Sequence, residues 1–264
     1  MSRSIPSHLA EIIEELELEQ PELVTTDEIR ELIDQFDVKI PDTRVIQLLA
    51  EKGWLLKTDV RGVWEFSPAE RAGSYSKESP FLPLKAIRKK DPDRDIRVAL
   101  DSAMWCHDFL DRLPSEIEVV LPPEDHVPAA IERNYRVLRF NAHLDPVTSN
   151  DVSVQRLETI LVHLVDKPNN VQSWTSVFDW LPDLVEDVER EDVLTELHDR
   201  SHATKIRFSY LLSGLAPDMV ESLDIEPAGK VWFGPRETLR RHNATWNVAD
   251  TILPVEPVDI DPVR

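Results

Sequence analysis

The sequence contains few of the residues on which several common kinds of site depend. Its single cysteine, Cys106, allows neither an internal disulfide nor a metal site built from several thiolates. Its six glycines are scattered, so the glycine-rich loops of Walker-type and dinucleotide-binding proteins are not expected. No stretch approaches about 18 uncharged apolar residues, and the N-terminus lacks a signal-peptide pattern. We therefore expect a protein of the reducing cytoplasm with no membrane span.

Positive charge is also scarce. Fifty Asp and Glu residues stand against thirty Lys and Arg, which gives a net charge of −20 and excludes nucleic-acid binding through overall charge. Any DNA contact must be local. The carboxylates occur in nearly every segment, and such a surface keeps a protein soluble in concentrated salt, where the Debye length falls to about 3 Å. We hypothesise a halophilic source; the alternative is an acidic mesophilic protein.

The N-terminal region predicts three helices. Apolar residues recur at helical spacing over residues 9–16 and 29–36. Thr25 and Glu28 have the spacing of a capping box at the start of the second helix. A third helix is expected to begin after Pro41. Its buried side and C-terminal glycine are predicted to be Val45, Leu48, Leu49 and Gly53.

A hairpin is predicted at residues 54–66, with its turn at residues 59–62. Its inward-facing residues are predicted to be Trp54, Leu56, Trp64 and Phe66. Three helices followed by a hairpin is the element order of a winged helix, a variant of the helix-turn-helix. We therefore predict an α+β protein with a winged-helix DNA-binding domain at residues 1–76.

The rest of the chain mixes helical and strand patterns after a connection rich in Ser and Pro at residues 67–83. A helix is expected from Ala99 to Leu113. The predicted strands are IEVVLP, YRVLRF, VSVQRL and KVWF. Residues 158–212 are predicted to be mostly helical. Residues 77–264 are thus expected to form a larger mixed α/β domain with a helical C-terminal part.

The third helix and the hairpin hold the candidate DNA-binding residues. Arg44, Gln47 and Glu51 lie away from the predicted core, with Thr43 at the helix start. Arginine pairs bidentately with guanine and glutamine with adenine, each contributing about 1–3 kcal/mol of discrimination. Residues 38–62 hold five cations and three anions, whereas the whole predicted domain holds eight and sixteen. The predicted DNA-binding residues are Lys39, Thr43, Arg44, Gln47, Lys52, Lys57 and Arg61. The alternative is a protein-docking module with solvated cations.

A second basic cluster lies late in the chain, on a segment that also carries aromatic residues. Its members are Lys230, Arg236, Arg240 and Arg241, with His242 nearby. Such a cluster could contact flanking DNA, an acidic partner or RNA. The alternative is intramolecular pairing with the carboxylates of the same domain.

Patterns for catalysis and metal binding are weaker. His198 and His202 are four residues apart but lack a third ligand, so surface or capping roles are preferred. Cys106 and His107 are neighbours that do not face each other on a helix, which favours a buried structural cysteine. Neither a Gly-x-Ser-x-Gly elbow nor a His-Glu-x-x-His motif is present. We expect no enzymatic activity, no cofactor and no metal; the alternative is an unrecognised active site in the second half.

Six segments, taken in order, carry a resemblance to a known family. They are GWLLKTDVRGVWEFSPAERAGSYS, SPFLPL, SAMWCHDFLDRLP, IEVVLP, VQRLETILVHLVDKP and KVWFGPR. Together they resemble the AbiEi-type antitoxins, winged-helix regulators from type IV toxin–antitoxin systems. The resemblance implies an N-terminal domain that binds operator DNA and a C-terminal domain that opposes a nucleotidyltransferase-like toxin. It implies DNA contacts from Thr43, Arg44, Gln47 and the wing around Lys57 and Arg61, and no catalytic residues.

The chain resembles the antitoxin rather than the toxin, because it lacks the Gly-Ser motif with paired aspartates expected of the toxin. It departs from the family in its acidity and at Asp108, the position at which the family resemblance implies a glycine. We therefore predict a transcriptional regulator that binds the double-stranded DNA of its own promoter and counteracts a toxin. The alternative is a solitary winged-helix regulator whose second domain binds another protein or a ligand.

Overall fold

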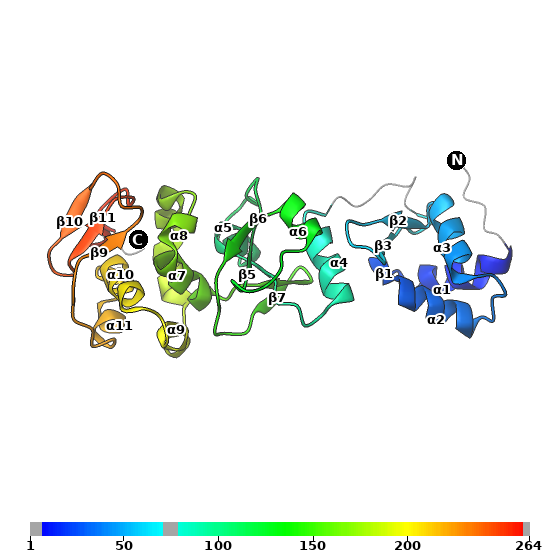
Figure 1. Ribbon diagram of the computed structural model, residues 1–264, viewed down its shortest axis with the longest axis horizontal. Coiled ribbons are helices and arrows are strands. Elements are labelled where there is room, and N and C mark those ends of the chain that lie inside the picture. The colour runs from blue at the N-terminus through cyan, green and yellow to red at the C-terminus, as the bar shows by residue number, and fades with distance from the viewer. Residues whose placement is uncertain (1–6, 71–78, 261–264) are drawn as a thin grey trace. The chain divides into compact units, whose positions relative to one another are not determined.

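The computed structural model describes residues 7–70 and 79–260, which group into two units (Figure 1). Unit 1 runs to Arg94 and includes Pro128–Asn134, and unit 2 holds Asp95–Val127 and the chain from Tyr135 onward. The predicted boundary near residue 76 lies outside the described residues. Unit 1 extends past that point because α4 (Leu82–Lys90) packs on the sheet of this unit and on α6 (Ala129–Asn134).

Unit 1 contains the three predicted helices. They are α1 (Ala10–Glu19), preceded by the short η1 (Ser7–Leu9), α2 (Thr26–Gln35) and α3 (Asp42–Glu51). The predicted capping box is confirmed: the Glu28 amide donates to Thr25 Oγ1 (3.1 Å), and the Thr25 amide donates to Glu28 Oε2 (2.7 Å). Gly53 follows α3 with a φ of 77°, which glycine adopts without steric cost. One part of the predicted α3 core is wrong, since Ile46 is buried and Leu48 only half-buried.

The sheet of unit 1 is antiparallel and has the order β1-β3-β2. Its strands are β1 (Leu23–Thr25), β2 (Leu55–Lys57) and β3 (Val63–Phe66). The hairpin is confirmed, but two of its inward residues are not: Leu55 and Val63 are buried, whereas Leu56 and Trp64 are half-buried. Leu55 packs in the helical core, and Val63 packs with Leu23 and Ala86. Both faces of the sheet are therefore covered, which the assumed alternation did not allow.

Unit 2 is built on a mixed five-stranded sheet of order β6-β5-β4-β8-β7. The strands are β4 (Arg97–Val98), β5 (Glu118–Leu121), β6 (Arg136–Arg139), β7 (Val147–Ser149) and β8 (Val152–Val154). The predicted strands at β5, β6 and β8 are confirmed. The helix predicted from Ala99 to Leu113 is shorter, because α5 (Leu100–Cys106) ends at a left-handed turn in which Asp108 has a φ of 64°. Glycine adopts this conformation at lower cost, which gives the departure at Asp108 a structural meaning.

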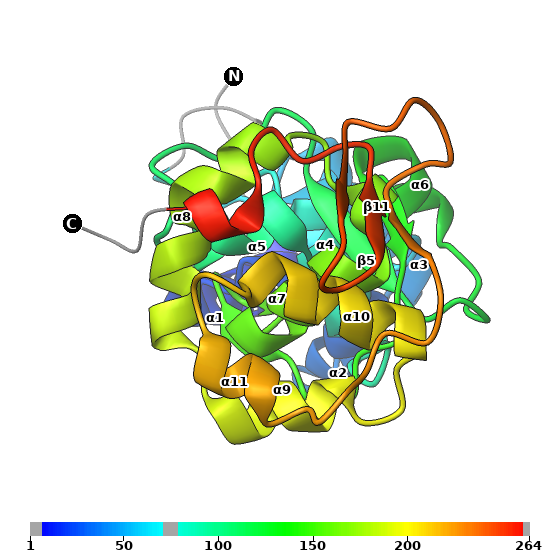
Figure 2. The same cartoon turned by 90° about the vertical axis from the view of Figure 1, so that its left-hand side faces the viewer.

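The remainder of unit 2 is helical and ends in a three-stranded sheet of order β10-β11-β9. The elements are α7 (Leu157–Asp166), η2 (Pro168–Asn170), α8 (Trp174–Asp187), α9 (Arg190–Leu197), α10 (His202–Leu212), α11 (Pro217–Glu221), β9 (Val231–Phe233), β10 (Arg241–Asn243), β11 (Val248–Asp250) and η3 (Pro257–Asp259). Nearly all of α7 is buried, because it packs against α5, α8, α9 and α10 (Figures 1 and 2). The predicted α+β class is confirmed. Across residues 7–70 and 79–260, no helix is long and apolar enough to cross a bilayer.

Candidate functional site

The exposed side of α3 carries the residues predicted to contact bases. Thr43, Arg44 and Gln47 are exposed, while Val45 and Leu49 are fully buried on the opposite side of the helix. The amphipathic spacing of α3 produces this division, because the apolar residues must face α1, α2 and the sheet. Three polar side chains of the predicted kind therefore share one solvent-facing side of a helix.

Glu51 modifies this surface. Gln47 Nε2 donates a hydrogen bond to Glu51 Oε1 (2.8 Å), and Arg44 Nη1 lies 3.8 Å from the same oxygen. The side chains of Arg44 and Glu51 are half exposed, so the contacts with Glu51 hold its partners only weakly. The two predicted base-contacting residues are thus paired with a carboxylate that a nucleic-acid ligand would have to displace.

The other predicted cations of this unit lie around α3 and the hairpin. Lys39 is exposed and pairs with Asp37, and Lys52 caps the C-terminus of α3. Lys57 ends β2 and is exposed, and Arg61 is exposed in the turn between β2 and β3. All seven predicted DNA-binding residues therefore belong to one unit and lie at its surface.

Three further cations of unit 1, which were not among the predicted DNA-binding residues, join this region. Lys90 Nζ, from α4, donates to the carbonyl oxygen of Arg61 (2.8 Å). Arg133 of α6 lies 3.6 Å from Asp59, and Arg30 of α2 donates to a carboxylate oxygen of α3 (2.7 Å). The available signal was the basic last turn of α4, but only the fold shows that it reaches the hairpin turn. We call Arg30, Lys90 and Arg133 the added cations.

The contact of Arg30 also positions α3. Its acceptor is Asp42, whose second carboxylate oxygen accepts a hydrogen bond from the Thr43 amide (2.7 Å). The hydrogen bond from Arg30, together with that from the amide, lowers the pKa of Asp42 below its ordinary value. Asp42 therefore stays ionised at the positive end of α3 and ties this helix to α2.

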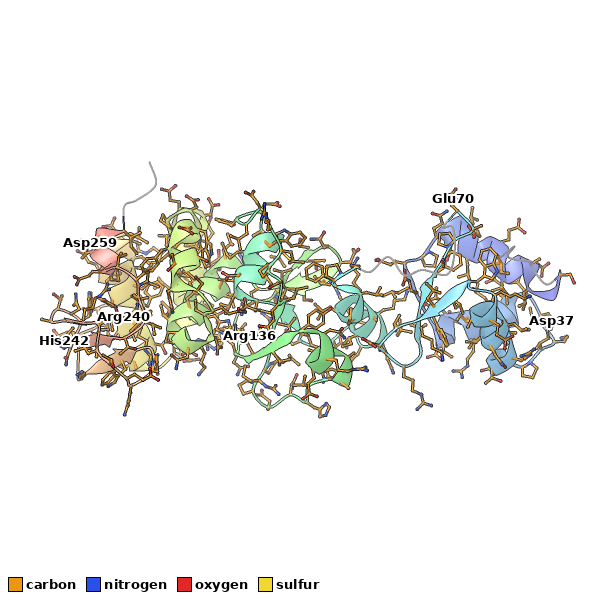
Figure 3. All side chains as sticks on the ribbon, turned by 90° about the horizontal axis from the view of Figure 1, so that it is seen from above. Asp37, Glu70, Arg136, Arg240, His242 and Asp259 are labelled. Carbon is orange, nitrogen blue, oxygen red and sulfur yellow. The ribbon has the colours of Figure 1, made fainter. Side chains whose placement is uncertain are left out.

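The four cations of the second basic cluster have two different environments in the structure. Arg240 and Arg241 donate to backbone carbonyls of residues 252–254, so they fasten the C-terminal segment to the last sheet. Lys230 lies 4.8 Å above the ring of Trp232, and Arg236 is exposed. Figure 3 shows Arg240 in this part of unit 2. Two members of the cluster thus have structural contacts, and two face solvent.

Arg241 belongs to a buried polar group. Its Nε lies 3.3 Å from Oδ2 of Asp250, a fully buried residue that is its cross-strand partner on β11. Asp250 also accepts hydrogen bonds from the Tyr210 hydroxyl (3.3 Å) and from two backbone amides. Burial and the nearby Asp250 carboxylate raise the pKa of Tyr210. For Arg241, the intramolecular alternative therefore describes the observed contacts.

The residues weighed for metal and thiol chemistry have other partners. His198 Nδ1 lies 3.1 Å from Asp199, and His202 Nε2 lies 2.9 Å from the carbonyl oxygen of Glu226. Cys106 is half-buried rather than fully buried, because α5 ends at this residue. Burial and the Asp108 carboxylate raise the pKa of the Cys106 thiol to about 11. The thiol is therefore uncharged at neutral pH.

Comparison with known proteins finds a family model that matches part of the chain and a solved structure that shares its fold. The family model of the AbiEi antitoxin C-terminal domain matches residues 97–214, which confirms the resemblance to AbiEi-type antitoxins and supports an antitoxin role. The crystal structure of the RV2827C protein from Mycobacterium tuberculosis has a TM-score of 0.77 and 22% sequence identity, over 96% of this chain and 94% of that chain. The two chains therefore share their fold. No curated protein matches the chain.

Proposed function

We propose that this protein is the antitoxin of a type IV toxin–antitoxin pair, which represses its own operon through a winged helix and counteracts a nucleotidyltransferase-like toxin. The single observation that carries the antitoxin role is the AbiEi domain at residues 97–214. The proposed toxin type follows from the family resemblance.

The DNA-binding part of the proposal is supported by unit 1. Its element order, α1-β1-α2-α3-β2-β3, with a three-stranded antiparallel sheet, is that of a winged helix. In this class the helix at the position of α3 enters the major groove, where arginine and glutamine side chains contact base edges. Of the added cations, Lys90 brings positive charge to the hairpin turn, where it donates to a carbonyl oxygen, whereas Arg30 and Arg133 pair with carboxylates.

Two substitutions in the full chain test the roles assigned to α3 and the wing. We expect Arg44→Ala to weaken binding to the promoter duplex and to reduce the preference over a scrambled duplex, because Arg44 is assigned a base contact. We expect Arg61→Ala to weaken binding to both duplexes about equally, because Arg61 is assigned a phosphate contact. Fluorescence anisotropy measures both affinities.

The exposed Arg112 provides the matched control, since Arg112→Ala removes the same charge from unit 2, whereas the proposed interface belongs to unit 1. Equal loss of preference from Arg44→Ala and Arg61→Ala would contradict the assigned roles. Equal weakening by Arg112→Ala would show that net charge alone decides binding.

The antitoxin step is tested in cells that carry the toxin encoded beside this gene. We expect the full chain with Arg44→Ala and Arg61→Ala to lose repression of the operon while still restoring growth. This separation is expected because residues 97–214, which match the antitoxin domain, lie outside α3 and the hairpin. A neighbouring gene that encodes no toxin, or growth rescue that requires Arg44 and Arg61, would contradict the proposal.

A further inference from the structure

Unit 2 contains two adjoining cavities near its last sheet. They have volumes of about 590 and 340 Å³, and both are walled by Asn169 and Pro235. Pockets that hold small molecules typically have volumes of about 300–1,000 Å³. We call the two cavities together the basic cleft, for the charge of its walls. It is large enough for a ligand of nucleotide size.

The walls of the basic cleft carry charge of one sign. Its lining residues include Arg207, Lys230, Arg236 and Arg240, and none of the residues that line either cavity in the described chain is an Asp or Glu. This is unusual for a protein in which carboxylates outnumber cations by fifty to thirty. A concave surface lined by charges of one sign concentrates ligands of the opposite sign. The composition of the walls therefore favours an anion.

Two of these cations, Arg207 and Arg240, donate their hydrogen bonds to uncharged acceptors in the part of the chain that the structure describes. Arg207 donates to the carbonyl oxygens of Trp232 (2.7 Å) and Val165 (3.2 Å), and Arg240 donates to those of residues 252 and 253. Carbonyl oxygens satisfy hydrogen bonds but carry no net charge. Burial lowers the pKa of Arg207 although Asp166 acts in the opposite direction. An anion in the basic cleft would supply the missing negative charge.

The start of α8 adds donors with the same preference. Ser173, Trp174 and Thr175, at the N-terminus of this 14-residue helix, line the larger cavity. The free amides and the dipole of a helix N-terminus favour negatively charged groups. Lys230 and Arg236 are exposed side chains that line the smaller cavity. The start of a helix thus lines one part of the cleft and exposed cations line another.

We propose that the basic cleft binds a small polyphosphate-bearing ligand of nucleotide size. Several phosphate groups match four cations spread over two adjoining cavities, which a single small anion could not contact at once. The ring of Trp232 and the side-chain amide of Asn169 offer stacking and hydrogen bonds to the rest of such a ligand. The proposal does not depend on DNA binding by unit 1.

Isothermal titration of the full chain at one fixed salt concentration tests this site. The probes are ATP, pyrophosphate and adenosine. We expect ATP and pyrophosphate to bind and adenosine not to bind, because the phosphates supply the recognition. We expect Lys230→Glu and Arg236→Glu each to weaken ATP binding by about tenfold or more. Both side chains are exposed, and circular dichroism melting checks that the variants stay folded.

Arg112→Glu provides the control, because it makes the same charge change at an exposed residue that does not line the cleft. If it weakened ATP binding as much as Arg236→Glu, the cleft would not be the site. Failure of both ATP and pyrophosphate to bind would overturn the proposal, as would equal binding of adenosine and ATP. Binding of single-stranded RNA without binding of ATP or pyrophosphate would assign the cleft to a macromolecule instead.

Discussion

Gln47 Nε2 donates a 2.8 Å hydrogen bond to Oε1 of Glu51, one turn farther along α3. The same carboxylate lies 3.8 Å from the guanidinium of Arg44. The side chains assigned to base contacts are therefore held, in the free protein, by an anion that would face DNA phosphates. In the proposed DNA complex this arrangement costs binding energy, because two contacts must break and a carboxylate must approach the duplex.

We expect Glu51→Gln to strengthen binding to the promoter by about three- to tenfold. The substitution keeps the shape of the side chain but removes its charge. Fluorescence anisotropy measures the effect, and Glu11→Gln on α1 provides a control with the same charge change at another exposed position of the unit. Weaker binding of the Glu51→Gln variant would instead indicate that Glu51 accepts a hydrogen bond from a cytosine.

The sequence was sufficient to predict those parts of unit 1 that are determined by interactions between residues close together in the chain. The capping box of Thr25 and Glu28 and the helix start after Pro41 depend on residues three or four positions apart, and both are confirmed. Strand β1 was missed because its three residues give no periodic signal and are held by pairing with β3, about forty residues away. The packing of α4 on this sheet, which buries Val63, is likewise nonlocal.

The same distinction applies to the candidate sites. Arg44 and Gln47 were found because helical spacing determines which side of α3 is exposed. Arg30, Lys90 and Arg133 were missed because their contacts span from 12 to more than 70 positions along the chain. In unit 2, clustering in sequence overstated the basic site, since Arg241 pairs with Asp250 across the last sheet.

The pairing of Arg241 with Asp250 predicts a loss of stability. We expect Arg241→Ala to lower the free energy of unfolding by about 3 kcal/mol, because the substitution leaves the fully buried Asp250 without its cation. Arg236→Ala removes an exposed arginine from the same segment and should change stability by less than about 0.5 kcal/mol. Denaturant titration at fixed salt compares the two variants, and equal effects would contradict a structural role for the pair.

The position of Cys106 predicts slow thiol chemistry. Burial and the Asp108 carboxylate raise the pKa of this thiol to about 11, so only roughly one molecule in a thousand carries a thiolate at pH 8. We expect modification by a disulfide reagent to be about a hundredfold slower than for an unperturbed cysteine. Asp108→Asn should accelerate it, whereas Asp111→Asn, at a nearby exposed residue, should not. A rate equal to that of a free thiol would contradict the assigned environment.

The raised pKa of Glu118 leads us to predict that the stability of the protein depends on pH. Burial and the neighbouring Asp101 raise the pKa of Glu118 from 4.5 to about 7, although Arg136 acts in the opposite direction. The folded state therefore binds a proton that the unfolded state releases above about pH 4.5, and this contribution to stability is lost as the pH rises through 7.

Glu118→Gln removes this titrating group while keeping its shape. We expect the free energy of unfolding to fall less between pH 5 and 7 in the variant than in the parent, by on the order of 2 kcal/mol. Glu124→Gln, at an exposed residue of the same unit, serves as the control. Parallel pH profiles for the parent and the Glu118→Gln variant would show that Glu118 does not hold the proton.

The acidic surface predicts an unusual response of promoter binding to salt. Ordinary protein–DNA affinity falls steeply with salt, because each neutralised phosphate releases counterions, with a slope near −0.9 per contact. This chain has a net charge of −20, so bringing its carboxylates near DNA requires an uptake of cations that opposes the release. We expect a shallow or inverted slope between about 0.5 and 2 M potassium chloride. The melting temperature should also rise over this range, since screening reduces repulsion among the carboxylates. A steep negative slope with no thermal stabilisation would contradict both the balance of ions proposed for the complex and the halophilic hypothesis.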